Sequence, residues 1–76
     1  MSKLPVVSGK KVLSVLVKYG FYVHDQKGSH IHLRHPEKRP VTIPNHKTIA
    51  KGTLRAILKE AGINLEEFLN LLIIIE

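Results

Sequence analysis

Apolar and polar residues alternate strictly over positions 30–34 of the chain. Ile31 and Leu33 are the apolar residues, and the positions around them hold His30, His32 and Arg34. A period of two residues is typical of a β-strand, and it places aliphatic side chains on one face and polar side chains on the other. We therefore expect a strand from about residue 29 to residue 34, with one face on a core and the imidazoles and guanidinium exposed to solvent.

Two shorter segments before and after this strand also have strand character. Residues 21–26 (Phe-Tyr-Val-His-Asp-Gln) are rich in aromatic and β-branched side chains, and residues 41–43 (Val-Thr-Ile) are followed by Pro44. Lys27-Gly28 predicts a tight turn between the first two strands, because glycine readily adopts positive φ. Residues 35–40 contain two prolines and predict the next turn.

Apolar residues recur every three or four positions over residues 9–19, which predicts an amphipathic helix. Ser8 can cap its start, and Gly20 can end it. The apolar stripe is expected to consist of Val12, Leu13, Leu16 and Val17, with Val15 and Tyr19 at its margins.

Two more helices are predicted towards the C-terminal end. One begins near residues 51–53, with Thr48 or Thr53 as its cap and Gly62 as its stop. Its apolar stripe is Leu54, Ile57, Leu58 and Ala61. The other runs from residue 65 to about residue 72 and begins with a capping box formed by Asn64 and Glu67.

The order helix, strand, strand, strand, helix, helix predicts an α+β fold, in which a three-stranded antiparallel sheet has its helices packed on one face. The length of 76 residues indicates a single domain over residues 1–76. A domain this small buries only roughly 60% of its extended-chain surface, which favours a surface site over a deep pocket.

Basic residues outnumber acidic ones by 12 to 6, which gives a net charge of +6 and a pI near 9.9. Such a charge favours a polyanionic partner: nucleic acid, an acidic protein or an anionic membrane. Four of the six acids lie near the C-terminal end, at Glu60, Glu66, Glu67 and Glu76. We therefore expect the anion-binding surface on the first three-quarters of the chain, with RNA as the polyanion.

The chain has no cysteine, which excludes disulfides, thiolate nucleophiles and cysteine-ligated zinc and fits a reducing cytoplasm. The N-terminal residues lack the apolar region of a signal peptide. The apolar run at residues 69–75 is too short to span a bilayer. A cytoplasmic protein with no membrane partner is expected.

Four motifs follow one another along the chain: Gly28-Ser29-His30, Arg34-His35-Pro36, Val41-Thr42-Ile43-Pro44-x-His46, and Lys51-Gly52-Thr53-Leu54-Arg55-x-Ile57-Leu58-x-x-Ala61-Gly62. In this order and spacing they resemble the HicA toxins, the YcfA-like mRNA interferases of prokaryotic toxin–antitoxin systems. The likeness extends from about Val7 to Leu72. The C-terminal helix is its least specific part.

The resemblance implies a fold like that of double-stranded-RNA-binding domains, with a short additional C-terminal helix. It also implies ribosome-independent cleavage of mRNA, growth inhibition, and neutralisation by a HicB-like antitoxin that covers the active site. The catalytic histidine of the family's Gly-x-His element falls on His30. Operator DNA is expected to be bound, if at all, only through the antitoxin complex.

RNA carries its own nucleophile, the 2′-hydroxyl, so cleavage needs a base, an acid and a cation near the phosphate. We assign the acid/base role to His30, because an imidazole exchanges protons near neutral pH. No metal or other cofactor is required. His30 and His32 have a spacing that could ligate zinc, but a third ligand is not obvious beyond His24, His46 or Asp25.

The predicted RNA contacts are the polar and basic residues of the turns and strand around His30 and of the following loop and helix start: Lys27, Gly28, Ser29, His32, Arg34, His46, Lys47, Lys51 and Arg55. Structural roles compete with several of these assignments. His30 could be a strand histidine bonded to a loop, Gly28 a plain turn residue, and Arg55 a solvated side chain. A direct catalytic role for His32 stays open at this point, because one histidine leaves the second proton-transfer group unnamed.

Two other functions fit the same fold and charge. A non-catalytic double-stranded-RNA-binding module would bind RNA without cleaving it. A small basic protein–protein adaptor would have no salt-sensitive affinity for RNA, whereas RNA binding weakens steeply with salt. The Gly28-Ser29-His30 element favours the nuclease.

Overall fold

Three strands form an antiparallel sheet in the order β1-β2-β3, with β2 in the centre. The computed structural model describes residues 4–75, so Glu76, one of the C-terminal acids, lies outside the described residues. The strands are β1 (Tyr22–Lys27), β2 (His30–Arg34) and β3 (Val41–Pro44). In β2 the aliphatic side chains are buried, whereas His30 and Arg34 are exposed, which confirms the alternation expected from the sequence.

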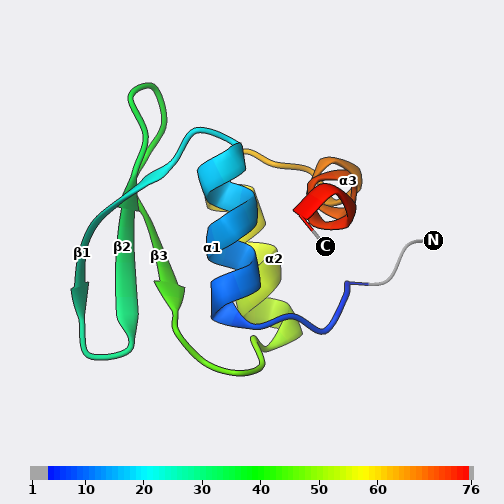
Figure 1. Ribbon diagram of the computed structural model, residues 1–76, viewed down its shortest axis with the longest axis horizontal. Helices are drawn as coiled ribbons and strands as arrows, with labels where there is room; N and C mark the ends of the chain where they lie inside the picture. The colour runs from blue at the N-terminus through cyan, green and yellow to red at the C-terminus, as the bar shows by residue number, and fades with distance from the viewer. Residues whose placement is uncertain (1–3, 76) are drawn as a thin grey trace.

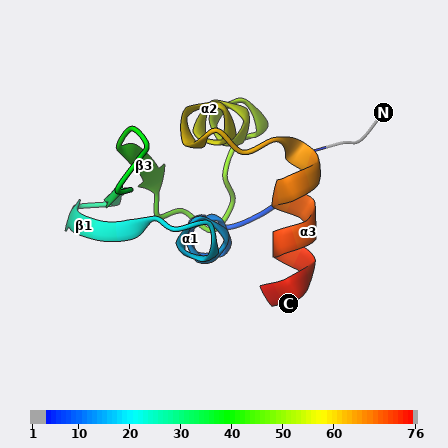
Figure 2. The same cartoon turned by 90° about the horizontal axis from the view of Figure 1, so that it is seen from above.

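Helices α1 (Gly9–Lys18) and α2 (Lys51–Ala61) both pack on one face of the sheet, mainly over β3, and α1 lies in front of α2 in the view of Figure 1. Helix α3 (Leu65–Ile75) packs against α1 on the side away from the sheet and runs across both other helices (Figure 2). The predicted α+β fold and element order are therefore confirmed. No helix among residues 4–75 has the length and apolar character needed to cross a membrane.

Strand β1 lies at the outer edge of the sheet, and none of its residues is fully buried. Phe21, just before it, is only 2% exposed and anchors this part of the chain in the core, whereas its neighbour Tyr22 is 52% exposed. The strand begins one residue later than predicted and extends to Lys27. The helices do not cover β1, which is why Val23 remains 48% exposed although it pairs with the buried Leu33.

Helix α1 begins where Ser8 was predicted to cap it: the backbone N–H of Lys11 donates to Ser8 Oγ at 3.1 Å. Its buried side chains are Val12, Val15 and Leu16, and Val17 is 50% exposed. The prediction that Val17 belongs to the buried stripe was therefore wrong, as was the marginal place given to Val15. Val17 lies five residues after Val12, and at about 100° per residue it points roughly 140° away from that residue.

Helix α2 buries the predicted stripe of Leu54, Ile57, Leu58 and Ala61. It ends at Gly62, which adopts the left-handed conformation at φ 72°. The predicted threonine caps were wrong, because the N-cap is Ala50 and no side chain bonds to the helix start. Thr53 lies within the first turn, and Thr48 lies two residues before the cap.

Helix α3 begins with the predicted capping box. The backbone N–H of Glu67 donates to Asn64 Oδ1 at 2.8 Å, and the N–H of Asn64 donates to Glu67 Oε1 at 3.3 Å. The helix runs to Ile75, three residues past the predicted end, and buries Phe68 and Leu72. Phe68 is the largest fully buried side chain among the described residues, so α3 completes the core.

Candidate functional site

One end of the molecule brings together the β1–β2 turn, the loop after β3 and the first residues of α1 and α2 (Figure 1). Backbone hydrogen bonds tie these segments to one another: Asn45 N–H donates to the Ser29 carbonyl at 2.6 Å, and Gly9 N–H donates to the His46 carbonyl at 2.9 Å. A Cβ at Gly9 would overlap the carbonyl oxygen of Pro44, so only glycine allows this close approach. The Gly28-Ser29-His30 motif, the loop with His46 and the first residues of α2 thus meet at one polar end of the fold, whereas the Arg34-His35-Pro36 motif begins at the far end of β2.

His30 is the first residue of β2 and is exposed on the outer face of the sheet, opposite α1 and α2. In the antiparallel register it stands between Lys27 on β1 and Pro44 on β3. Gly28 adopts φ 59° in the turn, with no atom within 4 Å of the position of an added Cβ. Its glycine is therefore explained by the turn conformation, and the turn leaves His30 with the Lys27 ammonium as its cross-strand neighbour.

A β-bulge interrupts the pairing of β1 with β2 between Val23 and Asp25. His24 is the extra residue, because Val23 pairs with Leu33 and Asp25 pairs with the next residue of β2, His32. Without this insertion Asp25 would share the inner face with Val23. The bulge instead moves Asp25 to the outer face, where the register also gathers Tyr22, Lys27, His30, His32, Arg34 and Thr42.

Asp25 and His32 form a hydrogen-bonded pair across the two strands, with 2.5 Å between Asp25 Oδ1 and His32 Nδ1. The other carboxylate oxygen lies 3.9 Å from His24 Nε2. The hydrogen bond from His32 is the main cause that lowers the pKa of Asp25 below its ordinary value; burial raises this pKa, and the charges of His32, His24 and Lys27 lower it. An ionised carboxylate only accepts hydrogen bonds, so His32 donates from Nδ1 and leaves Nε2 as its free nitrogen.

The predicted cations do not all lie near His30. Arg34 is on the same face but at the opposite end of β2, four residues on, which is about 13 Å along a strand. His46 and Lys47 are exposed in the loop after β3, next to Asn45, which bonds to Ser29. The structure therefore groups Lys27, Gly28, Ser29, His30 and the loop with His46 and Lys47 at one end, and leaves Arg34 apart from them.

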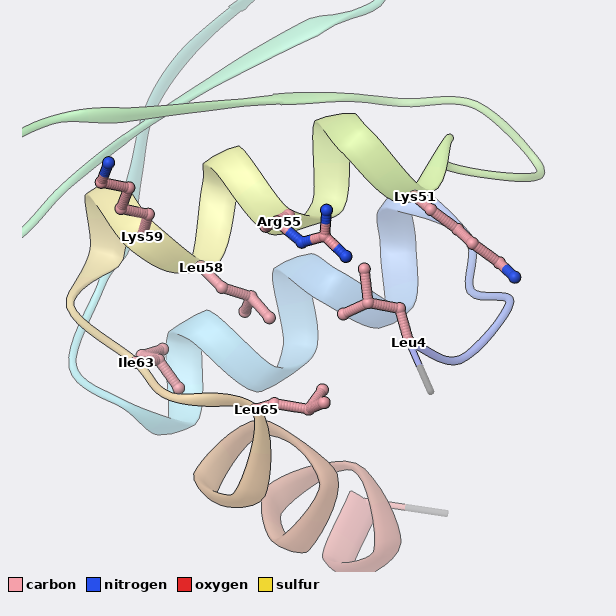
Figure 3. Close-up of a pocket in the computed structure, with 7 residues that line it drawn as sticks. All are labelled: Leu4, Lys51, Arg55, Leu58, Lys59, Ile63 and Leu65. Atoms are coloured by element: carbon pink, nitrogen blue, oxygen red, sulfur yellow. The ribbon is translucent and has the colours of Figure 1, made fainter. Parts of the chain in front are cut away.

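Lys51 and Arg55 lie on α2, where they border an apolar groove together with Lys59 (Figure 3). The floor of this groove is formed by Leu4, Leu58, Ile63 and Leu65. Because Leu65 belongs to α3, the groove opens on the side of α2 away from the sheet. Lys51, the first residue of the helix, is at the end of the fold near the β3–α2 loop, but Arg55 is one turn further from it.

Sequence reasoning named His32 as an RNA contact but did not find its partner Asp25 as part of the site. Asp25 lies two residues after Val23, so regular alternation would place it on the inner face of the sheet with Val23, away from His32. The β-bulge moves Asp25 to the outer face, and no residue type in this segment indicates that a bulge forms there. Among residues 4–75 there is no group of three or more acidic or histidine side chains arranged to hold a metal ion.

Comparisons with known proteins agree with the motifs. A family model described as the HicA toxin of bacterial toxin-antitoxin systems matches residues 9–63. A toxin–antitoxin complex from Streptococcus pneumoniae contains a chain that is 34% identical, with a TM-score of 0.68, and the match covers 75% of this chain and 98% of that one. A search of curated proteins found no match. The family match spans more than half of the sequence and confirms the expected resemblance, with α3 outside the matched residues. The chain therefore belongs to the HicA toxin family.

Proposed function

We propose that this toxin is a metal-independent endoribonuclease that cleaves mRNA in the cytoplasm with His30 as a catalytic residue. The observation that carries the proposal is the exposed imidazole of His30 at the end of β2, with Lys27 directly across from it and a polar face around it. A small basic domain with an exposed polar face suits a long, flexible polyanion such as RNA. Lys47 and Lys51, at the same end, extend the basic surface.

The chemistry uses the substrate's own 2′-hydroxyl. His30 takes the proton from this hydroxyl, the 2′-oxygen forms a bond to phosphorus, and the bond from phosphorus to the 5′-oxygen breaks as that oxygen gains a proton. The products are a 2′,3′-cyclic phosphate and a 5′-hydroxyl. Lys27 stabilises the negative charge that develops on the phosphate oxygens, since a cation placed there in advance lowers the barrier.

The same face is the proposed binding site of a HicB-like antitoxin. An acidic partner surface is expected, because the toxin end that carries Lys27, Lys47 and Lys51 is basic and complementary charge speeds and orients association. Such a partner neutralises the toxin by covering His30. A purified toxin–antitoxin complex in which the His30 imidazole still reacts with diethyl pyrocarbonate as fast as in the free toxin would contradict this part of the proposal.

The proposal is tested with single-stranded RNA in the presence of EDTA, comparing the wild type with His30→Ala. The wild type should cleave and leave 2′,3′-cyclic phosphate ends, and His30→Ala should lose at least a hundredfold in rate. Lys18→Ala is the control, because Lys18 is exposed at the opposite end of α1. Equal circular dichroism spectra and melting temperatures establish that the variants are folded. Tight RNA binding without cleavage by the wild type would indicate the double-stranded-RNA-binding module instead.

A further inference from the structure

Cleavage through the 2′-hydroxyl needs two proton transfers, on opposite sides of the phosphorus atom. The attacking 2′-oxygen loses a proton and the leaving 5′-oxygen gains one, and the in-line geometry keeps these oxygens apart. An imidazole that is within hydrogen-bond distance of one of these oxygens is therefore too far from the other to exchange a proton with it. The proposed role of His30 requires a second proton-transfer group on the same face, within reach of the same phosphate.

His32 stands at the required position. It lies two residues after His30 on the same face of β2, and residues with this spacing are about 7 Å apart along a strand. That separation leaves room for one phosphate with a hydrogen bond to each ring. No other histidine among the described residues shares this face by strand register with His30.

The contact with Asp25 prepares His32 for proton transfer. Because the ionised carboxylate accepts from Nδ1 at 2.5 Å, the ring is oriented and its tautomer is defined. Nε2, at the opposite side of the ring, is left to exchange a proton with substrate. The charged or titratable groups around this pair are His24, Lys27 and Tyr22 from β1 and His30 and Arg34 from β2, and β3 contributes only the uncharged Thr42 and Pro44.

We propose that His32 is the second catalytic residue of this toxin and that Asp25 is its positioning residue. The inference rests on the proposed nuclease function. His30 accepts the 2′-hydroxyl proton, the 2′-oxygen bonds to phosphorus, the bond from phosphorus to the 5′-oxygen breaks, and Nε2 of protonated His32 donates its proton to the 5′-oxygen. His30 ends protonated and His32 neutral, and proton exchange with water restores both. The negative charge of Asp25 stabilises the positively charged ring before the transfer.

The test compares two substrates of one sequence: ordinary RNA, and RNA in which sulfur replaces the 5′-bridging oxygen at the cleaved bond. A thiolate leaves without being protonated, so an acid is needed only for ordinary RNA. His32→Ala should lose about 10²-fold or more on ordinary RNA and much less on the sulfur substrate. His30→Ala should lose activity on both. His32→Gln, whose amide can still donate to Asp25, repeats the test if the alanine variant is unfolded.

Asp25→Asn provides the readout specific to positioning. The amide cannot stabilise a charged ring, so kcat on ordinary RNA should fall and cleavage of the sulfur substrate should change much less, and Asp25→Glu, which keeps the carboxylate, should restore part of the lost kcat. A merely structural Asp25 would lower activity on both substrates alike, which would overturn its assignment.

The nuclease function and the catalytic role of His32 can be refuted separately. If the wild type cleaves neither substrate, the nuclease function falls and the role of His32 with it. If His30→Ala is inactive but His32→Ala and His32→Gln cleave both substrates within threefold of the wild type, only the role of His32 is refuted. An equal loss on both substrates for the folded His32 variants would also refute the acid role.

Discussion

Removal of the Phe68 side chain tests whether α3 is an integral part of this toxin's fold, since the helix lies outside the residues matched by the family. Phe68 is 0% exposed and belongs to the same core as Leu16, Leu33 and Leu54. Truncation of a buried phenylalanine to alanine costs about 3–5 kcal/mol, from lost burial and from the cavity that remains. A chain of 76 residues has a total stability of about 4–11 kcal/mol. Phe68→Ala should therefore remove about a quarter or more of the free energy of unfolding.

The measurement is urea unfolding followed by circular dichroism at 222 nm, a far-ultraviolet wavelength that reports backbone helix. Ile73→Ala is the matched control, because Ile73 is on the same helix but 71% exposed, and its loss should change stability by no more than about 0.5 kcal/mol. If Phe68→Ala does not fold, Phe68→Leu provides a milder change of about 1–2 kcal/mol. A loss below about 1 kcal/mol for Phe68→Ala, equal to that of the control, would refute the packing of α3 on the core.

Two further predictions concern glycine and pH. Gly9→Ala should destabilise the fold by about 1–3 kcal/mol, because the new methyl group overlaps the backbone carbonyl of Pro44. Gly52→Ala, with open space around the added methyl group, should stabilise α2 by about 0.5 kcal/mol. Equal melting temperatures for the two variants would contradict this prediction. The pKa of Asp25 is lower in the folded chain than its ordinary value of 3.8, so its stabilising effect is complete above that value and is lost as the pH falls through the folded pKa. The stability difference between wild type and Asp25→Asn, measured by urea unfolding, should therefore shrink as the pH falls below about 5. A difference that stays constant on acidification would show that Asp25 is not stabilised as a carboxylate.

Much of the fold could be predicted because its elements are strongly amphipathic and carry local signals. The alternation around Ile31 and Leu33, the Ser8 cap and the Asn64–Glu67 capping box are all properties of short segments. The predictions of the buried stripe of α1 and of the cap of α2 were wrong because neighbouring residues in these segments are almost equally suited to the same role. In α1 the apolar arc is wider than the buried stripe, and packing against both β3 and α3 decides that Val15 is inside and Val17 outside.

The candidate site was predictable only in part, for a related reason. The position of His30 follows from β2 and the Gly28 turn, both of which are local. The pair of Asp25 and His32 depends on a change of register between two strands, which is a property of their pairing and not of either sequence. The distance of Arg34 from His30 likewise follows from its place at the far end of the strand, although both residues share one face.

The bulge at His24 also affects the free edge of the sheet. β1 is an edge strand with unpaired backbone groups on its outer side, and its exposed Tyr22 and Val23 would favour pairing with a strand from another molecule. An extra residue in the middle of a six-residue strand breaks the regular spacing of those groups and increases the local twist. The insertion that turns Asp25 towards His32 therefore also makes this edge a poor template for aggregation, so a deletion that straightened β1 would endanger solubility as well as chemistry.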